Sequence, residues 1–126
     1  MMLDWNDYRK QLAAGVKEIG QLSPDTIKGY MALSAAGQKA DLLGAKVHEL
    51  IALAVAVTLR CDGCITVHTE AAIKHGATRE DIAEALGVAT TVNAGAALVY
   101  SARVMDAFNE YPSATAPRKP DSLASA

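Results

Sequence analysis

The spacing of apolar residues along the first half of the chain predicts three helices. Leu12, Val16 and Ile19 recur at intervals of three and four, which places them on one face of a helix over residues 5–21. Ser23, followed by a proline and an acid, is typical of a helix start and predicts a second helix over residues 24–37. The third, from residue 43 or 44 to 59, is apolar on all sides in its later half. We expect this helix to be buried at the centre of the fold.

The second half of the chain is also helical in pattern, with one interruption at residues 60–63. A fourth helix follows it to His75, where Gly76 has the place of a helix-ending glycine. Thr78 and Asp81 resemble a capping box and open a segment to about residue 109, expected to break or kink around residues 93–95. We therefore predict an all-α fold of about five to six helices with a central antiparallel helical hairpin. It forms a single domain over residues 1–110, and the proline-containing residues 111–126 form a loose C-terminal tail.

The composition supports close-packed helices and excludes several classes of protein. The 126 residues are 51% hydrophobic but only 5% aromatic, and alanine is abundant. A net charge of -2 gives no electrostatic attraction to nucleic acid or to an acidic membrane. The longest strictly apolar run, residues 50–57, is far shorter than the roughly 20 residues of a membrane span. The first residues lack the pattern of a secretory signal, so we expect a cytoplasmic protein whose thiols are kept reduced.

Four polar residues stand out: Glu49, Cys61, Cys64 and His68, in the pattern E-x11-C-x-x-C-x-x-x-H. Cys64 and His68 are four residues apart, which on a helix places them on one face about 6 Å apart. If Cys64 lies in the first helical turn, the positive end of the helix favours its reactive thiolate. The midpoint of Glu49 and His68 falls between residues 58 and 59, just before the interruption, so an antiparallel turn there would bring them roughly level across a hairpin. A carboxylate fixes the tautomer of a neighbouring imidazole. The pattern predicts a dithiol beside a proton relay.

Other interpretations of these residues remain open from the sequence. A zinc site would use Cys61, Cys64 and His68 with a fourth ligand from His48 or Glu49, although this is not a usual zinc-finger spacing. Covalent haem attachment is excluded, because isoleucine follows the second cysteine. Taken singly, the glutamate fits a solvated helix end and the histidine a core position. Arg60 adjoins the first cysteine and either stabilises a thiolate or faces solvent.

The four residues and the segment His75–Ala85 resemble the alkylhydroperoxidase D (AhpD)-like branch of the carboxymuconolactone decarboxylase superfamily. The resemblance covers residues 44–108. It implies an all-helical homo-oligomer, a hexamer built as a trimer of dimers, with a trimer as the alternative. It also implies a thiol-dependent peroxidase of peroxiredoxin type, with no cofactor and no metal. The substrate would be a small hydroperoxide, and the electron donor a dithiol or protein that the sequence does not identify.

The resemblance further implies a role for each residue of the motif. Cys64 would attack the peroxide, and Cys61 would resolve the resulting sulfenic acid as a disulfide. His68 would deprotonate Cys64 through a water, and Glu49 would orient the histidine. Gly63 departs from the family, whose best-studied members have histidine immediately before the second cysteine. The alternative function is a thiol carrier or redox sensor without peroxide turnover.

Overall fold

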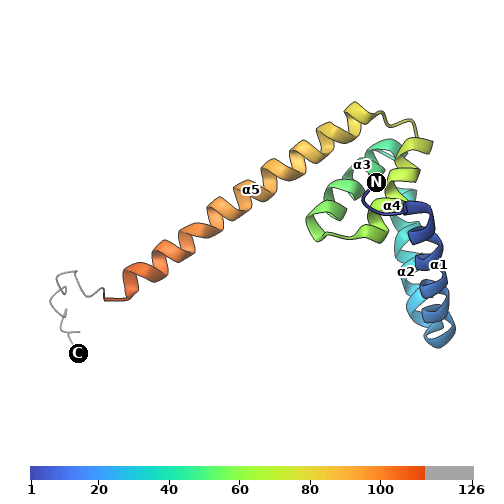
Figure 1. Ribbon diagram of the computed structural model, residues 1–126, viewed down its shortest axis with the longest axis horizontal. Coiled ribbons are helices and arrows are strands. Elements are labelled where there is room, and N and C mark those ends of the chain that lie inside the picture. The colour runs from blue at the N-terminus through green and yellow to red at the C-terminus, as the bar shows by residue number, and fades with distance from the viewer. Residues whose placement is uncertain (113–126) are drawn as a thin grey trace. The chain divides into compact units, whose positions relative to one another are not determined.

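The computed structural model describes residues 1–112 and consists of five helices (Figure 1). Within this range no residue is in a strand, so the predicted all-α class is confirmed. The helices are α1 (Trp5–Leu22), α2 (Pro24–Lys39), α3 (Ala45–Leu59), α4 (Asp62–Lys74) and α5 (Arg79–Glu110). The predicted tail lies outside the described residues from position 113 onward.

Side-chain caps begin two of the helices as their sequences predict. The Asp4 carboxylate accepts the Asp7 N–H at 3.0 Å at the start of α1. Before α5, the Thr78 hydroxyl accepts the Asp81 N–H at 3.0 Å, and the Thr78 N–H donates to the Asp81 carboxylate at 2.9 Å. This second hydrogen bond, to the charged form, holds the pKa of Asp81 below its ordinary value. The capping box therefore forms with Asp in the place usual for Glu or Gln.

Helix packing in residues 1–91 is centred on a hairpin of α3 and α4. These two helices pack on one another, and α1 packs against both α2 and α4 (Figure 1). The buried residues are small except for one leucine: Ala56 and Leu53 on α3, Ala72 and Thr66 on α4, and Ala89 on α5. Alanines at the contacts let helix backbones approach closely, which accounts for an alanine-rich, aromatic-poor composition.

Helix α3 is not buried on all sides, contrary to the prediction. Ile51 and Val55 are 49% and 51% exposed, and Leu59 is 70% exposed. Within residues 1–91, α4 packs on one face of α3, and these side chains on the rest of α3 are exposed. An apolar face of this kind costs free energy in water unless something covers it.

Helix α5 is continuous from Arg79 to Glu110, so the predicted break near residues 93–95 is wrong. A single glycine in a helix costs about 1 kcal/mol relative to alanine, and the surrounding alanines and leucines are strong helix formers.

The chain divides into two units, Met1–Thr91 and Val92–Ala126, and the boundary falls inside this helix. Every described residue of the second unit is exposed.

By length and composition alone, α5 is apolar enough to cross a membrane, with a mean hydropathy of 1.5 over its best window. No charged residue lies between Glu84 and Arg103. The segment contains no long strictly apolar run, because threonine, asparagine, glycine and serine interrupt it. Length and composition do not separate a membrane helix from one covered by other protein.

The ends of α3 and α4 share one hydrogen-bonding pattern. At the end of α3, the Cys61 N–H donates to Ala56 O at 3.0 Å and the Arg60 N–H to Val57 O at 3.3 Å. At the end of α4, Ala77 and Gly76 donate in the same register, at 2.9 and 3.0 Å. Both are Schellman motifs, which need one residue in the left-handed conformation. Gly76 supplies it at φ 86° without strain, but at the first end it is Arg60, at φ 54°.

We expect Arg60→Gly to stabilise the fold by about 1 kcal/mol, because a side chain in the left-handed region costs about that much. Gly76→Ala should destabilise by a similar amount for the same reason. Urea unfolding at fixed protein concentration measures both, with Arg60→Ala as the control that removes the side chain but keeps the strain. If Gly76→Ala destabilises while Arg60→Gly does not stabilise, the Arg60 side chain contributes an interaction that offsets its strain.

Candidate functional site

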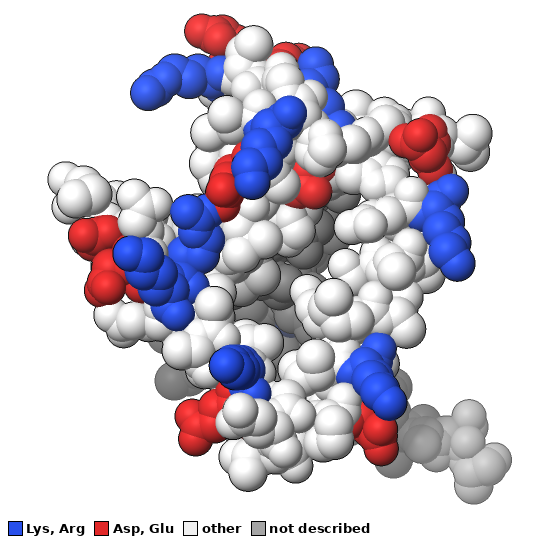
Figure 2. Space-filling view, turned by 90° about the vertical axis from the view of Figure 1, so that its right-hand side faces the viewer, with Lys and Arg blue, Asp and Glu red and all other residues white. Residues whose placement is uncertain are grey.

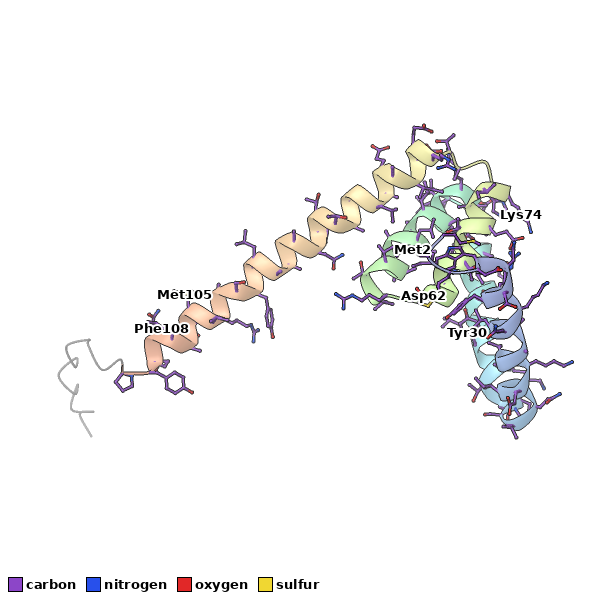
Figure 3. All side chains as sticks on the ribbon, in the orientation of Figure 1. Met2, Tyr30, Asp62, Lys74, Met105 and Phe108 are labelled. Atoms are coloured by element: carbon purple, nitrogen blue, oxygen red, sulfur yellow. A yellow bond between two sulfur atoms is a disulfide. The ribbon has the colours of Figure 1, made fainter. Side chains whose placement is uncertain are left out.

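The two cysteines lie at the junction of α3 and α4. Cys61 is the N-cap of α4, and Cys64 is the third residue of that helix. Their sulfur atoms form a disulfide, with the Cα atoms 5.3 Å apart. Figure 3 shows Asp62, between them, at the start of α4. Both cysteines are partly accessible rather than buried, so the pair is open to exchange with thiols from solution.

Cys61 is held at both its backbone and its side chain. Its N–H donates to Ala56 O and ends α3, while its sulfur accepts the Cys64 N–H at 3.2 Å and caps α4. One residue thus satisfies groups at the ends of two helices that would otherwise lack partners. The turn is therefore positioned by local hydrogen bonds, and the sequence interruption at residues 60–63 corresponds to it.

His68 and Glu49 meet across the hairpin, as the sequence predicts. The His68 Nδ1 lies 2.7 Å from Glu49 Oε2, and the side chains are 34% and 20% exposed. An ionised carboxylate only accepts hydrogen bonds, so Nδ1 carries the proton that it shares with Glu49. In the neutral ring, this leaves Nε2 as the acceptor. His68 lies one helical turn after Cys64 on α4, so an imidazole with a fixed tautomer adjoins the dithiol.

Helix α1 covers the turn at Gly63. A Cβ atom built on Gly63 would lie 2.9 Å from the Leu12 Cδ2, closer than real Cβ contacts allow. A residue with a side chain therefore fits at Gly63 only if the flexible end of Leu12 moves.

The residues of the zinc interpretation are placed as follows in residues 1–112. No three side chains of His, Cys, Asp or Glu in this range are grouped to hold a metal ion. The two cysteine sulfurs are bonded to one another instead.

Arg60 is exposed at the left-handed position described above. Figure 2 shows basic and acidic side chains interspersed on the face in view, with no large patch of one sign.

The sequence did not indicate a cavity between α1 and α4. It encloses about 490 Å³ and is lined by Trp5, Asn6, Arg9, Ile65, Thr66, Thr69, Glu70 and Ile73. Arg9 and Glu70 form an ion pair across it, and none of the four motif residues lines it. Since its two walls are some 60 residues apart in the chain, no local pattern could have revealed it.

Comparison with known proteins decides the family. Residues 24–107 match the carboxymuconolactone decarboxylase family. The chain belongs to that family. The match includes α2, α3, α4 and all but the last three residues of α5. Helix α1, which supplies Leu12 and one wall of the cavity, lies outside it.

Similar proteins support the same assignment over most of the chain. An uncharacterized protein of Haemophilus influenzae is 43% identical over 109 residues, covering 86% of this chain and 96% of its own. Uncharacterized protein 4 in the cox locus of Paracoccus denitrificans is 32% identical over 98 residues, covering 78% and 88%. The crystal structure of an apo carboxymuconolactone decarboxylase family protein from Legionella pneumophila superposes with a TM-score of 0.67 at 34% identity. It covers 84% of this chain and 95% of its own.

Proposed function

We propose that this family member is a thiol-dependent peroxidase of the AhpD-like type, which cycles between a dithiol and the Cys61–Cys64 disulfide. The observation that carries the proposal is the hydrogen-bonded Glu49–His68 pair one turn from a cysteine that is paired with a second cysteine. A carrier needs only the cysteines. The partly buried carboxylate of Glu49 and imidazole of His68 can in addition transfer a proton, and peroxide reduction requires proton transfer.

The reaction balances with the residues present. The Cys64 thiolate attacks one peroxide oxygen, the O–O bond breaks, and the leaving alkoxide takes a proton, leaving Cys64 as a sulfenic acid. Cys61 attacks that sulfur, forms the disulfide and releases water. Two electrons pass from the dithiol to the hydroperoxide, which becomes an alcohol. An external dithiol then reduces the disulfide. His68 removes the Cys64 proton and returns one to the leaving oxygen, while Glu49 fixes the ring.

The test is a thiol titration with one equivalent of an organic hydroperoxide such as cumene hydroperoxide. We expect both thiols of each chain to be lost, and dithiothreitol to restore them. The doubly substituted Cys61→Ser/Cys64→Ser protein is the control and should not consume peroxide. A dithiol that reacts with disulfide reagents but not with hydroperoxide would overturn the peroxidase proposal and favour the thiol carrier or sensor.

We propose that the protein is a cytoplasmic homo-oligomer. A reversible dithiol needs a compartment in which disulfides are reduced. The exposed side of α3 (Ile51, Val55) and the second half of α5 are apolar surfaces that no described part of the chain covers. Met105 and Phe108 project from the end of α5 in Figure 3. Covering these surfaces with copies of the same chain produces closed symmetry without a separate partner.

We expect light scattering to show a hexamer at micromolar concentration, with a trimer as the next expected state. Leu98→Lys should shift the mass to a smaller species, because Leu98 is 76% exposed within the chain and would lie in the contact. Glu110→Lys, which adds positive charge at the end of the same helix, is the control and should assemble normally. A monomer at micromolar concentration would overturn the assembly.

A further inference from the structure

The two cysteines of the disulfide are served by different groups. The Cys61 sulfur occupies the N-cap position of α4 and accepts the Cys64 N–H at 3.2 Å. A sulfur there lies at the positive end of the helix and has a donor already directed at it. Cys64 is three residues further on, inside the first turn, and one turn before His68. The Cys61 sulfur therefore has a backbone N–H as its donor, whereas Cys64 lies one helical turn from the Glu49–His68 pair.

We propose that Cys61 is the resting thiolate of the dithiol, stabilised by the helix N-cap independently of His68. The same hydrogen bond makes Cys61 the leaving sulfur when the disulfide is reduced, so an external thiol bonds first to Cys64. This inference rests on the dithiol–disulfide cycle of the proposed function, but it does not depend on peroxide as the oxidant.

The bonds and protons balance in both directions. In reduction, an external thiolate attacks the Cys64 sulfur, the disulfide breaks, and the electron pair remains on Cys61. The second thiol of the reductant gives its proton to His68 and attacks the mixed disulfide, and the released Cys64 thiolate takes that proton. In oxidation, the Cys61 thiolate attacks the Cys64 sulfenic sulfur without first losing a proton, the S–O bond breaks, and the leaving hydroxide takes a proton from solvent to become water. Thiol exchange is faster when the leaving sulfur is the more stable thiolate.

The charged groups around Cys61 do not provide a simpler explanation. Arg60 and Asp62 flank it in sequence with opposite charges. On α3 and α4, Glu49 and His68 are hydrogen-bonded to each other. From α1, apolar Leu12 faces the turn, and the basic Arg9 is paired with Glu70 on α4. The backbone N–H is the donor that the structure shows on the Cys61 sulfur.

The first experiment measures alkylation of Cys61 by iodoacetamide against pH in Cys64→Ser, which keeps the backbone N–H at position 64. Cys64→Pro is the matched variant that lacks this N–H, and proline is tolerated in a first helical turn. We expect alkylation at pH 7 to be about threefold to tenfold slower in Cys64→Pro, a loss typical of one interaction at a helix terminus. Equal rates in two variants with unchanged circular dichroism would overturn the proposal.

The second comparison does not depend on the proline variant folding. Adding His68→Ala to Cys64→Ser should not change the pH dependence of Cys61 alkylation by iodoacetamide. Adding it to Cys61→Ser should slow alkylation of Cys64 near neutral pH. The proposal would fail if His68→Ala changed the pH dependence of Cys61 alkylation as much as that of Cys64. In that case, His68 would act on both sulfurs.

The third measurement locates the mixed disulfide. The oxidised wild-type protein is mixed briefly with glutathione, quenched in acid and digested for mass spectrometry. We expect glutathione on Cys64, and its presence on Cys61 would contradict the assigned leaving sulfur. None of these measurements uses a hydroperoxide. Failure of peroxide turnover therefore leaves this inference intact, and failure of this inference leaves the peroxidase proposal to its own test.

Discussion

Cys64→Ser is expected to abolish hydroperoxide reduction, because it removes the sulfur next to the imidazole. Cys64 is one helical turn from His68, whereas Cys61 is at the N-cap, almost two turns away. Stopped-flow mixing with cumene hydroperoxide should show no fast phase in this variant. Its remaining Cys61 thiol should still react with iodoacetamide, which shows that the loss is specific to peroxide.

Cys61→Ser separates the two cysteines further. It keeps the attacking sulfur but removes the one that closes the disulfide, so a Cys64 sulfenic acid should accumulate and then oxidise to sulfinic acid with excess peroxide. A dimedone-type probe followed by peptide mass spectrometry detects the sulfenic acid. If the wild-type protein, trapped early, carries the probe on Cys61 instead, the roles of the two cysteines are reversed.

The parts of this structure that sequence reasoning predicted are those with local signals. The start of α1 and the Thr78–Asp81 capping box follow from residue types whose hydrogen bonds span only three positions. Helix α2 also begins where Ser23 and the following proline predict, although the Ser23 side chain makes no capping hydrogen bond. The contact between Glu49 and His68 could also be predicted from local sequence. A short turn between two antiparallel helices determines which residues of the two helices lie opposite each other. The placement of Glu49 beside His68 is thus readable from the sequence.

The parts that were missed depend on distant or intermolecular contacts. Helix α5 continues through Gly95, because one glycine is too weak a signal against many strong helix formers. The left-handed Arg60 was not foreseen, since sequence rules place glycine at such positions. The apolar pattern of α3 predicts burial on all sides, but such a pattern does not indicate whether the covering residues belong to the same chain. The cavity between α1 and α4 joins residues with no sequence relation.

The Glu49–His68 pair leads to the second large expected effect. His68→Ala should slow the reaction of Cys64 with hydroperoxide by about 10²–10⁴-fold at neutral pH, the usual contribution of a positioned general base. Glu49→Gln keeps the shape of the side chain but removes the charge that faces Nδ1 at 2.7 Å. It should also slow the reaction. His75→Ala, beyond the end of α4, is the control and should react at the parent rate.

Because Glu49 acts through His68, the two losses should not add. The doubly substituted protein should react about as slowly as His68→Ala alone, as expected for residues that act as one unit. Raising the pH should partly rescue each variant, because hydroxide then supplies the Cys64 thiolate that the pair no longer provides. The fold should survive, since neither side chain contributes much apolar burial, and circular dichroism checks this. If Glu49→Gln reacts at the parent rate over the whole pH range, the hydrogen bond to His68 has no part in activating Cys64, and the relay is wrong even though its geometry is present.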